Sequence, residues 1–224
     1  MKTKIAILFV LAALGSNFNA QAQKFGSSIS KEVMGKTIRV PYTDVVSYLG
    51  HAEAGAQDEV KDGKNFYYIY VWVPVAAPEL GVRMTSPAGK RKIKNAIVSE
   101  DYTANAGSTD SFDTYITLER STILSKSNIT EESVAGATWF TLAQNDDSED
   151  GSKKGSNSLL RHKTDIKDPL SAITVGLYRI GFTTFKAGDV KGTFLAEIGS
   201  PVKLPGVVMA KTVEGLNAAL AAAK

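Results

Sequence analysis

The chain has 224 residues, of which 43% are hydrophobic and 22% are charged, and its formal net charge is +3. This composition is typical of a globular protein and excludes a disordered or membrane-spanning chain. The sequence contains no cysteine, which excludes disulfides, thiol catalysis and cysteine-ligated zinc.

The N-terminal segment, residues 1–22, has the pattern of a bacterial secretory signal peptide. Lys2 and Lys4 precede an apolar run over 5–14, which is too short to span a membrane, and a small-residue cleavage site stands at 20–22. Cleavage there removes both lysines and lowers the net charge to about +1. So small a charge argues against a nucleic-acid partner, which needs a concentrated positive surface. Without a cysteine we also expect that the exported chain is not lipidated.

Eight segments are predicted as strands because they are rich in β-branched and aromatic residues and are bounded by turn residues. They are 36–40, 44–50, 66–75, 81–86, 112–120, 138–143, 173–185 and 190–199. The segment 66–75 is apolar on both faces, which is typical of a central strand. We expect its aromatic residues, like Tyr178, Phe182 and Phe185, in the core rather than on a carbohydrate-binding surface.

A helical period occurs only at the C-terminus, over 212–224, where Thr212 is a candidate N-cap. Many strands with one terminal helix predict an all-β fold, an antiparallel β-sandwich that is jelly-roll-like or immunoglobulin-like. We assign 23–205 to the sandwich and 206–224 to a C-terminal helix packed on or beside it.

Two segments, 87–110 and 144–168, are predicted as loops, and the second has an acidic centre. There Asp146, Ser148 and Asp150, followed by a glycine, match the first half of an EF-hand calcium loop. Alternating carboxylates can converge on a hard cation, but the bidentate Glu that closes an EF-hand is missing. The loop alone therefore leaves two alternatives, a calcium site completed from elsewhere and a solvated acidic loop without an ion.

Sequence motifs of hydrolases are absent. The chain contains neither a G-x-S-x-G nucleophile elbow nor an H-E-x-x-H zinc motif. We therefore expect a protein that is not an enzyme.

Five stretches of the sequence carry a resemblance to a known family. They are Pro41-Tyr42 with Tyr48 and Gly50, FYYIYVWVP at 66–74, Glu79 with GVRMTSP at 81–87, FDTYITLER at 112–120 and GLYRIGFTTFKAGDVKGTF at 176–194. These stretches resemble the major surface lipoprotein family of leptospires and its relatives in marine bacteria. The resemblance implies a calcium-binding, jelly-roll-like sandwich with a C-terminal helix, linked to the binding of extracellular-matrix proteins.

The resemblance also implies a set of calcium ligands. Asp113 and Thr114 match an Asp-Thr pair on a strand, and Glu149 and Asp150 match two acids before a glycine. Ser156 stands where the family has a last ligand with an aromatic side chain, so here only its backbone carbonyl could serve.

Two further acids, Asp146 and Asp147, remain alternative ligands for the same ion.

The predicted function follows from these features. We expect an exported calcium-binding surface or envelope protein that acts as an interaction or adhesion module for matrix-like, glycan or protein ligands. It would lie at the cell surface or outer membrane, or be periplasmic or secreted. The alternatives are a structural envelope protein without functional calcium and a carbohydrate-binding sandwich.

Overall fold

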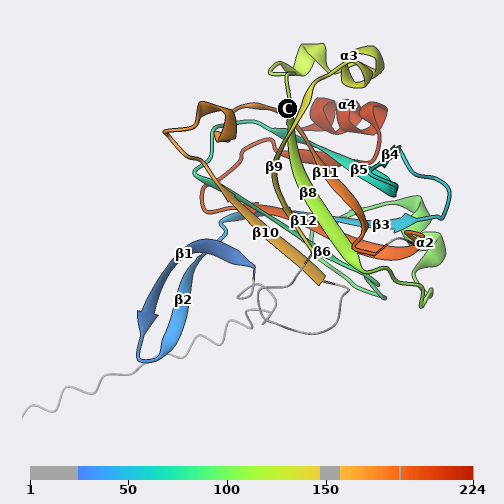
Figure 1. Cartoon of the computed structure of the whole chain (residues 1–224), viewed down its shortest axis with the longest axis horizontal. Coiled ribbons are helices and arrows are strands. Elements are labelled where there is room, and N and C mark those ends of the chain that lie inside the picture. Colours follow the sequence, from blue (N-terminus) through green and yellow to red (C-terminus); the bar gives the residue numbers. More distant parts are fainter. Residues whose placement is uncertain (1–24, 147–156, 187, 224) are drawn as a thin grey trace, which may run out of the picture.

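The computed structural model (Figure 1) describes residues 25–146, 157–186 and 188–223. Within them the predicted all-β fold, an antiparallel β-sandwich, is confirmed, because two sheets pack around a shared apolar core. The predicted signal peptide, residues 1–22, lies outside the described residues.

The first sheet has five strands in the order β10-β6-β12-β3-β7. Its strands are β3 (Asp44–Ala52), β6 (Glu79–Thr85), β7 (Ile97–Val98), β10 (Asn157–Lys163) and β12 (Gly192–Ser200). Neighbours are antiparallel except β3 and β7, which run parallel. The long pairing of β12 with β3 joins two segments that are far apart in the sequence, so this sheet depends on long-range contacts.

The second sheet has six strands, with β13-β5-β11-β8-β9 in order and β4 paired to β5. Its strands are β4 (Glu59–Lys61), β5 (Lys64–Val73), β8 (Thr114–Ser121), β9 (Trp139–Asn145), β11 (Gly176–Thr184) and β13 (Val208–Ala210). The predicted central strand 66–75 is β5. Ile69 and Val71 belong to the core between the sheets, whereas Trp72 packs with a separate cluster on the outer face. Both faces of β5 are therefore covered, which explains its apolar sequence.

Three α-helices and two short 3-10 helices complete the described chain. They are α2 (Glu100–Asn105), α3 (Glu131–Ala135), α4 (Val213–Ala222), η1 (Lys126–Asn128) and η2 (Pro169–Ser171). The predicted terminal helix is confirmed as α4, and Thr212 caps it by accepting a hydrogen bond from the Gly215 amide at 3.0 Å. Leu216 and Leu220 bury the helix on the outer face of the second sheet, in the cluster that contains Trp72.

The loop predictions are wrong in part. Residues 144–168 include the strand β10, which pairs with β6 along its whole length, and residues 87–110 include β7 and α2. The β10 sequence mixes polar and apolar residues and becomes a strand through its distant partner, because strand formation depends strongly on context. The helices α2 and α3 are too short to produce a helical period in the sequence.

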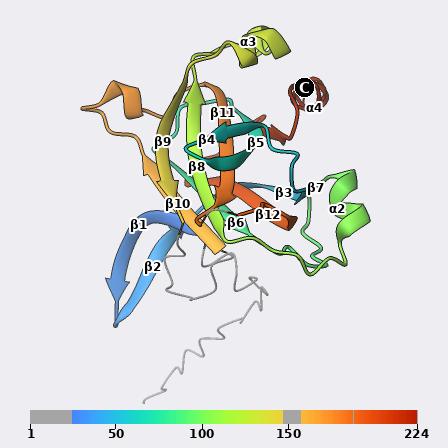
Figure 2. The same cartoon turned by 45° about the vertical axis from the view of Figure 1, so that its right-hand side comes forward.

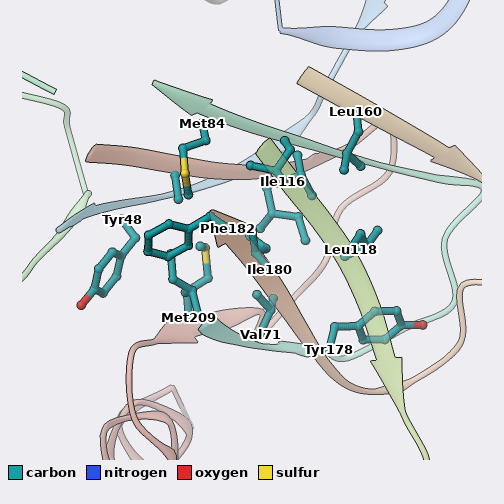
Figure 3. Close-up of a cluster of buried hydrophobic side chains, with 14 of the residues drawn as sticks. Tyr48, Val71, Met84, Ile116, Leu118, Leu160, Tyr178, Ile180, Phe182 and Met209 are labelled. Atoms are coloured by element: carbon teal, nitrogen blue, oxygen red, sulfur yellow. The ribbon is translucent and has the colours of Figure 1, made fainter. Parts of the chain in front are cut away.

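The core between the sheets is rich in aromatic residues (Figure 3). Phe182 and Tyr178 of β11 are fully buried, as predicted. The centroid of the Phe182 ring lies 4.7 Å from the centroid of the Phe194 ring on the facing sheet. The same prediction is wrong for Phe185, which is 49% exposed, and holds only in part for Tyr70 of β5, which is half-buried. Phe185 follows the end of β11, and its ring lies 5.5 Å from the Lys64 ammonium.

A separate hairpin projects from the sandwich (Figures 1 and 2). Its strands are β1 (Gly26–Val33) and β2 (Lys36–Pro41). The hairpin is anchored by Glu79, whose buried carboxylate accepts hydrogen bonds from the Ser28 amide at 2.8 Å and from the Tyr42 hydroxyl at 2.9 Å. Tyr42 lies against Gly81, where an added Cβ would come within 2.1 Å of the Tyr42 oxygen. Tyr42, Glu79 and Gly81, all within the stretches that carry the family resemblance, therefore meet at this anchor.

Candidate metal site

Asp113 and Thr114 lie where β8 begins, next to the start of β10. The Thr114 and Ser158 hydroxyls are 2.7 Å apart, and the Ser158 hydroxyl also lies within hydrogen-bond distance of the Thr114 carbonyl. Thr114 is fully buried while Asp113 is half-buried, which fits the alternation of side chains along a strand. The Thr114 hydroxyl has Ser158 as a protein partner, and the Asp113 side chain is accessible in part to solvent.

Asp146, the first acid after β9, lies at the same end of the sheet. Asn145 is the partner of Ile116 in the β8–β9 pairing, and its side-chain amide donates to the Leu159 carbonyl of β10 at 2.6 Å. The next residue, Asp146, lies close enough to β8 that its charge adds to burial in raising the pKa of Tyr115. The β8 start, the β9 end and the β10 start therefore meet at one place.

The other predicted ligands lie outside the described residues. They are Asp147, Glu149, Asp150 and Ser156. Among the residues that the structure does describe, no group of three His, Asp or Glu side chains could hold a metal ion. The two carboxylates described at this end, on Asp113 and Asp146, are oxygen donors of the kind that Ca²⁺ prefers. A complete ligand set would need oxygens from the segment 147–156.

Fold and site together define a β-sandwich protein in which the start of β8, the end of β9 and the start of β10 meet beside Asp113 and Asp146. The chain belongs to the surface lipoprotein family of the Spirochaetales order, whose model matches residues 36–209, from β2 to β13. The family resemblance of the sequence is thereby confirmed. No curated protein matches the chain.

Family membership makes this an exported, surface-associated protein, and it points to a role other than catalysis. In the part of the chain that the structure describes, none of the helices combines the length and the apolar character needed to cross a bilayer. The expectation of an unlipidated chain is not supported by the comparison, because the family is one of lipoproteins.

Sequence reasoning missed a second group of polar residues, on the outer face of the second sheet. Arg179 of β11 and Glu119 of β8 are joined there by a hydrogen bond of 2.6 Å. The signal was present in the sequence, since both charged residues stand inside strand-forming runs, at 112–120 and 173–185. Charged residues are rarely buried unless they are paired, so each predicts a partner on a neighbouring strand.

Proposed function

We propose that this surface protein binds Ca²⁺ at the end of the sandwich where β8, β9 and β10 meet. The observation that carries the proposal is this convergence. Thr114 contacts Ser158, Asn145 donates to Leu159, and Asp146 acts on Tyr115, so the residues that border the segment 147–156 lie beside Asp113. Oxygen donors from a strand and from the acidic segment could then share one ion.

The proposed ligands are those that the family resemblance implies. Asp113, Glu149 and Asp150 would supply carboxylates, Thr114 an oxygen, and Ser156 its carbonyl.

Asp146 and Asp147 would take part if the acidic segment approaches the ion in another register. Water would complete the six to eight oxygens that Ca²⁺ takes.

We further propose that the ion serves an interaction surface. Without a cation, the closely spaced carboxylates of the acidic segment repel one another. A bound Ca²⁺ would hold that segment against β8, and ordering a surface before it meets a partner reduces the entropy lost on binding. The partner would be an extracellular-matrix protein or another surface ligand, as the resemblance implies.

The test is a melting curve of residues 23–224 in EDTA, in excess Ca²⁺ and in excess Mg²⁺. An ion that binds only the folded state stabilises it by about 2.7 kcal/mol at a hundredfold excess over the dissociation constant. We expect a rise in melting temperature with Ca²⁺ that exceeds the rise with Mg²⁺. We also expect Asp113→Ala and Asp150→Ala to reduce the rise strongly.

The matched control is Asp101→Ala, which removes an exposed carboxylate from α2, a helix that contacts β3 and β12. This variant is expected to keep the full response to Ca²⁺. If the parent protein shows no response to Ca²⁺, the proposal is wrong and the structural envelope protein without functional calcium becomes the better description. A full response in Asp113→Ala and Asp150→Ala would instead contradict the assignment of the ligands.

A further inference from the structure

A pocket of about 530 Å³ opens on the outer face of the second sheet. Residues of β4, β5, β8, β9, β11 and α3 line it. None of the ligands proposed for Ca²⁺ is among its lining residues. The volume lies within the range of pockets that bind small molecules, about 300–1,000 Å³.

The wall of the pocket is built around Arg179. Its guanidinium carbon lies 3.6 Å from the centroid of the Tyr68 ring and 4.3 Å from that of Trp139. Its Nε donates to the buried Glu119 carboxylate at 2.6 Å, and its terminal nitrogen lies 3.5 Å from Glu59. These contacts hold the aromatic rings and the carboxylates in fixed positions relative to one another.

Lys61 and Asp58 of the pocket are paired as well. Lys61 lies 3.8 Å from Glu119, and Asp58 accepts hydrogen bonds from the Lys211 ammonium and, at 2.7 Å, from the Tyr68 amide. The Tyr68 hydroxyl donates to Glu59. The polar groups are thus arranged before any ligand arrives, which lowers the entropic cost of binding.

Aromatic groups remain available to a ligand. Tyr70 and Trp139 are half-buried, with ring centroids 6.2 Å apart and ring planes at 42°. Neither the Tyr70 hydroxyl nor the Trp139 indole nitrogen forms a hydrogen bond to the described residues. Tyr and Trp each combine an apolar ring with a polar tip, so these two side chains suit a ligand that has both apolar and polar groups.

The pocket carries charges of both signs, with carboxylates in excess. Four of its lining residues carry carboxylates, Asp58, Glu59, Glu119 and Glu131, which repel an anion. Arg179 and Lys61 lie among them and offset part of this negative charge. A neutral polyhydroxylated molecule suits this mixture of groups, because each hydroxyl can donate to a carboxylate and accept from an ammonium, guanidinium or indole N–H.

We propose that this pocket binds a short neutral glycan. The C–H face of a sugar ring would pack on Trp139 and Tyr70, and its hydroxyls would bond to Glu59, Glu131 and Lys61 at the rim. A glycoprotein glycan and a neutral polysaccharide of the bacterial envelope share this chemistry. The site is independent of the calcium site, since it needs no residue of the acidic segment.

The test uses the intrinsic fluorescence of Trp139. The chain has two tryptophans, and Trp72→Phe removes the buried one, so that the remaining signal reports on the pocket. This protein is titrated with N-acetyllactosamine, mannotriose and a neutral polysaccharide fraction of the bacterial envelope, and with spermidine and a heparin fragment as charged probes. All titrations are run in both EDTA and Ca²⁺, and affinities are checked by calorimetry on the unmodified chain.

We expect a neutral probe to change the fluorescence and to bind equally well in EDTA, which separates this site from the proposed calcium function. A response to the two oligosaccharides supports a glycoprotein ligand, and a response to the envelope fraction supports an envelope ligand. By calorimetry, Trp139→Ala is expected to weaken binding about tenfold through loss of the stacking face. Phe140→Ala, which truncates the adjacent exposed aromatic of β9 outside the pocket, is expected to bind normally.

Trp139 also stacks on Arg179, so its removal could unfold the sheet. Glu131→Gln at the pocket rim and Tyr70→Phe, which keeps the ring, test the site without that risk, and each is expected to weaken binding several-fold. The proposal is overturned if no neutral probe binds at millimolar concentration, if only spermidine or heparin binds, or if neither Glu131→Gln nor Tyr70→Phe weakens binding.

Discussion

Replacement of Glu79 by alanine removes the anchor of the β1–β2 hairpin. The Glu79 carboxylate is 1% exposed and accepts hydrogen bonds from the Ser28 amide, the Ser28 hydroxyl and the Tyr42 hydroxyl. A two-stranded hairpin is marginally stable by itself in water. We therefore expect Glu79→Ala to loosen the hairpin as well as to lower the free energy of unfolding of the whole domain.

The magnitude follows from the groups that lose their partner. Tyr42 is buried, so its hydroxyl would be left without an acceptor at a cost of about 1–3 kcal/mol. Ser28 is half-buried, so water can replace part of the hydrogen bonding that its amide and hydroxyl lose. Removal of a buried carboxylate also relieves its desolvation, which offsets some of the loss. We expect a net destabilisation of about 2–4 kcal/mol.

The assay is urea denaturation followed by circular dichroism, with limited proteolysis of the hairpin as a local probe. Glu79→Gln keeps one acceptor oxygen and is expected to lose about 1–2 kcal/mol. Glu32→Ala, which truncates an exposed acid in the hairpin itself, is expected to stay within about 0.5 kcal/mol of the parent. If Glu79→Ala matches Glu32→Ala in both unfolding midpoint and cleavage rate, the carboxylate does not anchor the hairpin.

Three further predictions concern stability. Gly81→Ala places a Cβ 2.1 Å from the Tyr42 oxygen and is expected to cost about 1–3 kcal/mol in urea denaturation; an unchanged midpoint would show that Tyr42 moves away freely. Thr114→Val leaves the buried Ser158 hydroxyl without its side-chain partner and is expected to lower the free energy of unfolding by about 1–3 kcal/mol. The control Thr103→Val, at an exposed position of α2, is expected to change it little. Burial raises the pKa of Tyr178 above its ordinary value of about 10, so the folded state keeps a proton that the unfolded state releases. The free energy of unfolding is therefore expected to hold below about pH 10 and to fall as the pH rises further. Tyrosinate absorbance is expected to appear together with the loss of circular dichroism. Tyrosinate that forms fully before the protein unfolds would contradict this prediction.

The sequence by itself determined the fold class and most of the strands. The segment 66–75 is apolar on both faces, and it is a central strand whose two faces are both covered. Residues 112–118 alternate, and the structure buries Thr114 and Ile116 while leaving Tyr115 between them half-exposed. These are local signals, since side-chain periodicity and β-propensity are properties of neighbouring residues. The cap at Thr212 is local in the same way.

Only the tertiary structure decided β10 and the two groups of polar residues. The segment 157–163 is a strand because β6 pairs with it, and that pairing puts Ser158 against Thr114. Arg179 and Glu119 stand in separate runs of the sequence, and only the β11–β8 pairing makes them direct neighbours. Burial of the two charges is tolerated because the side chains pair with each other. The two residues are far apart in the chain, so sheet register rather than local propensity brings them together.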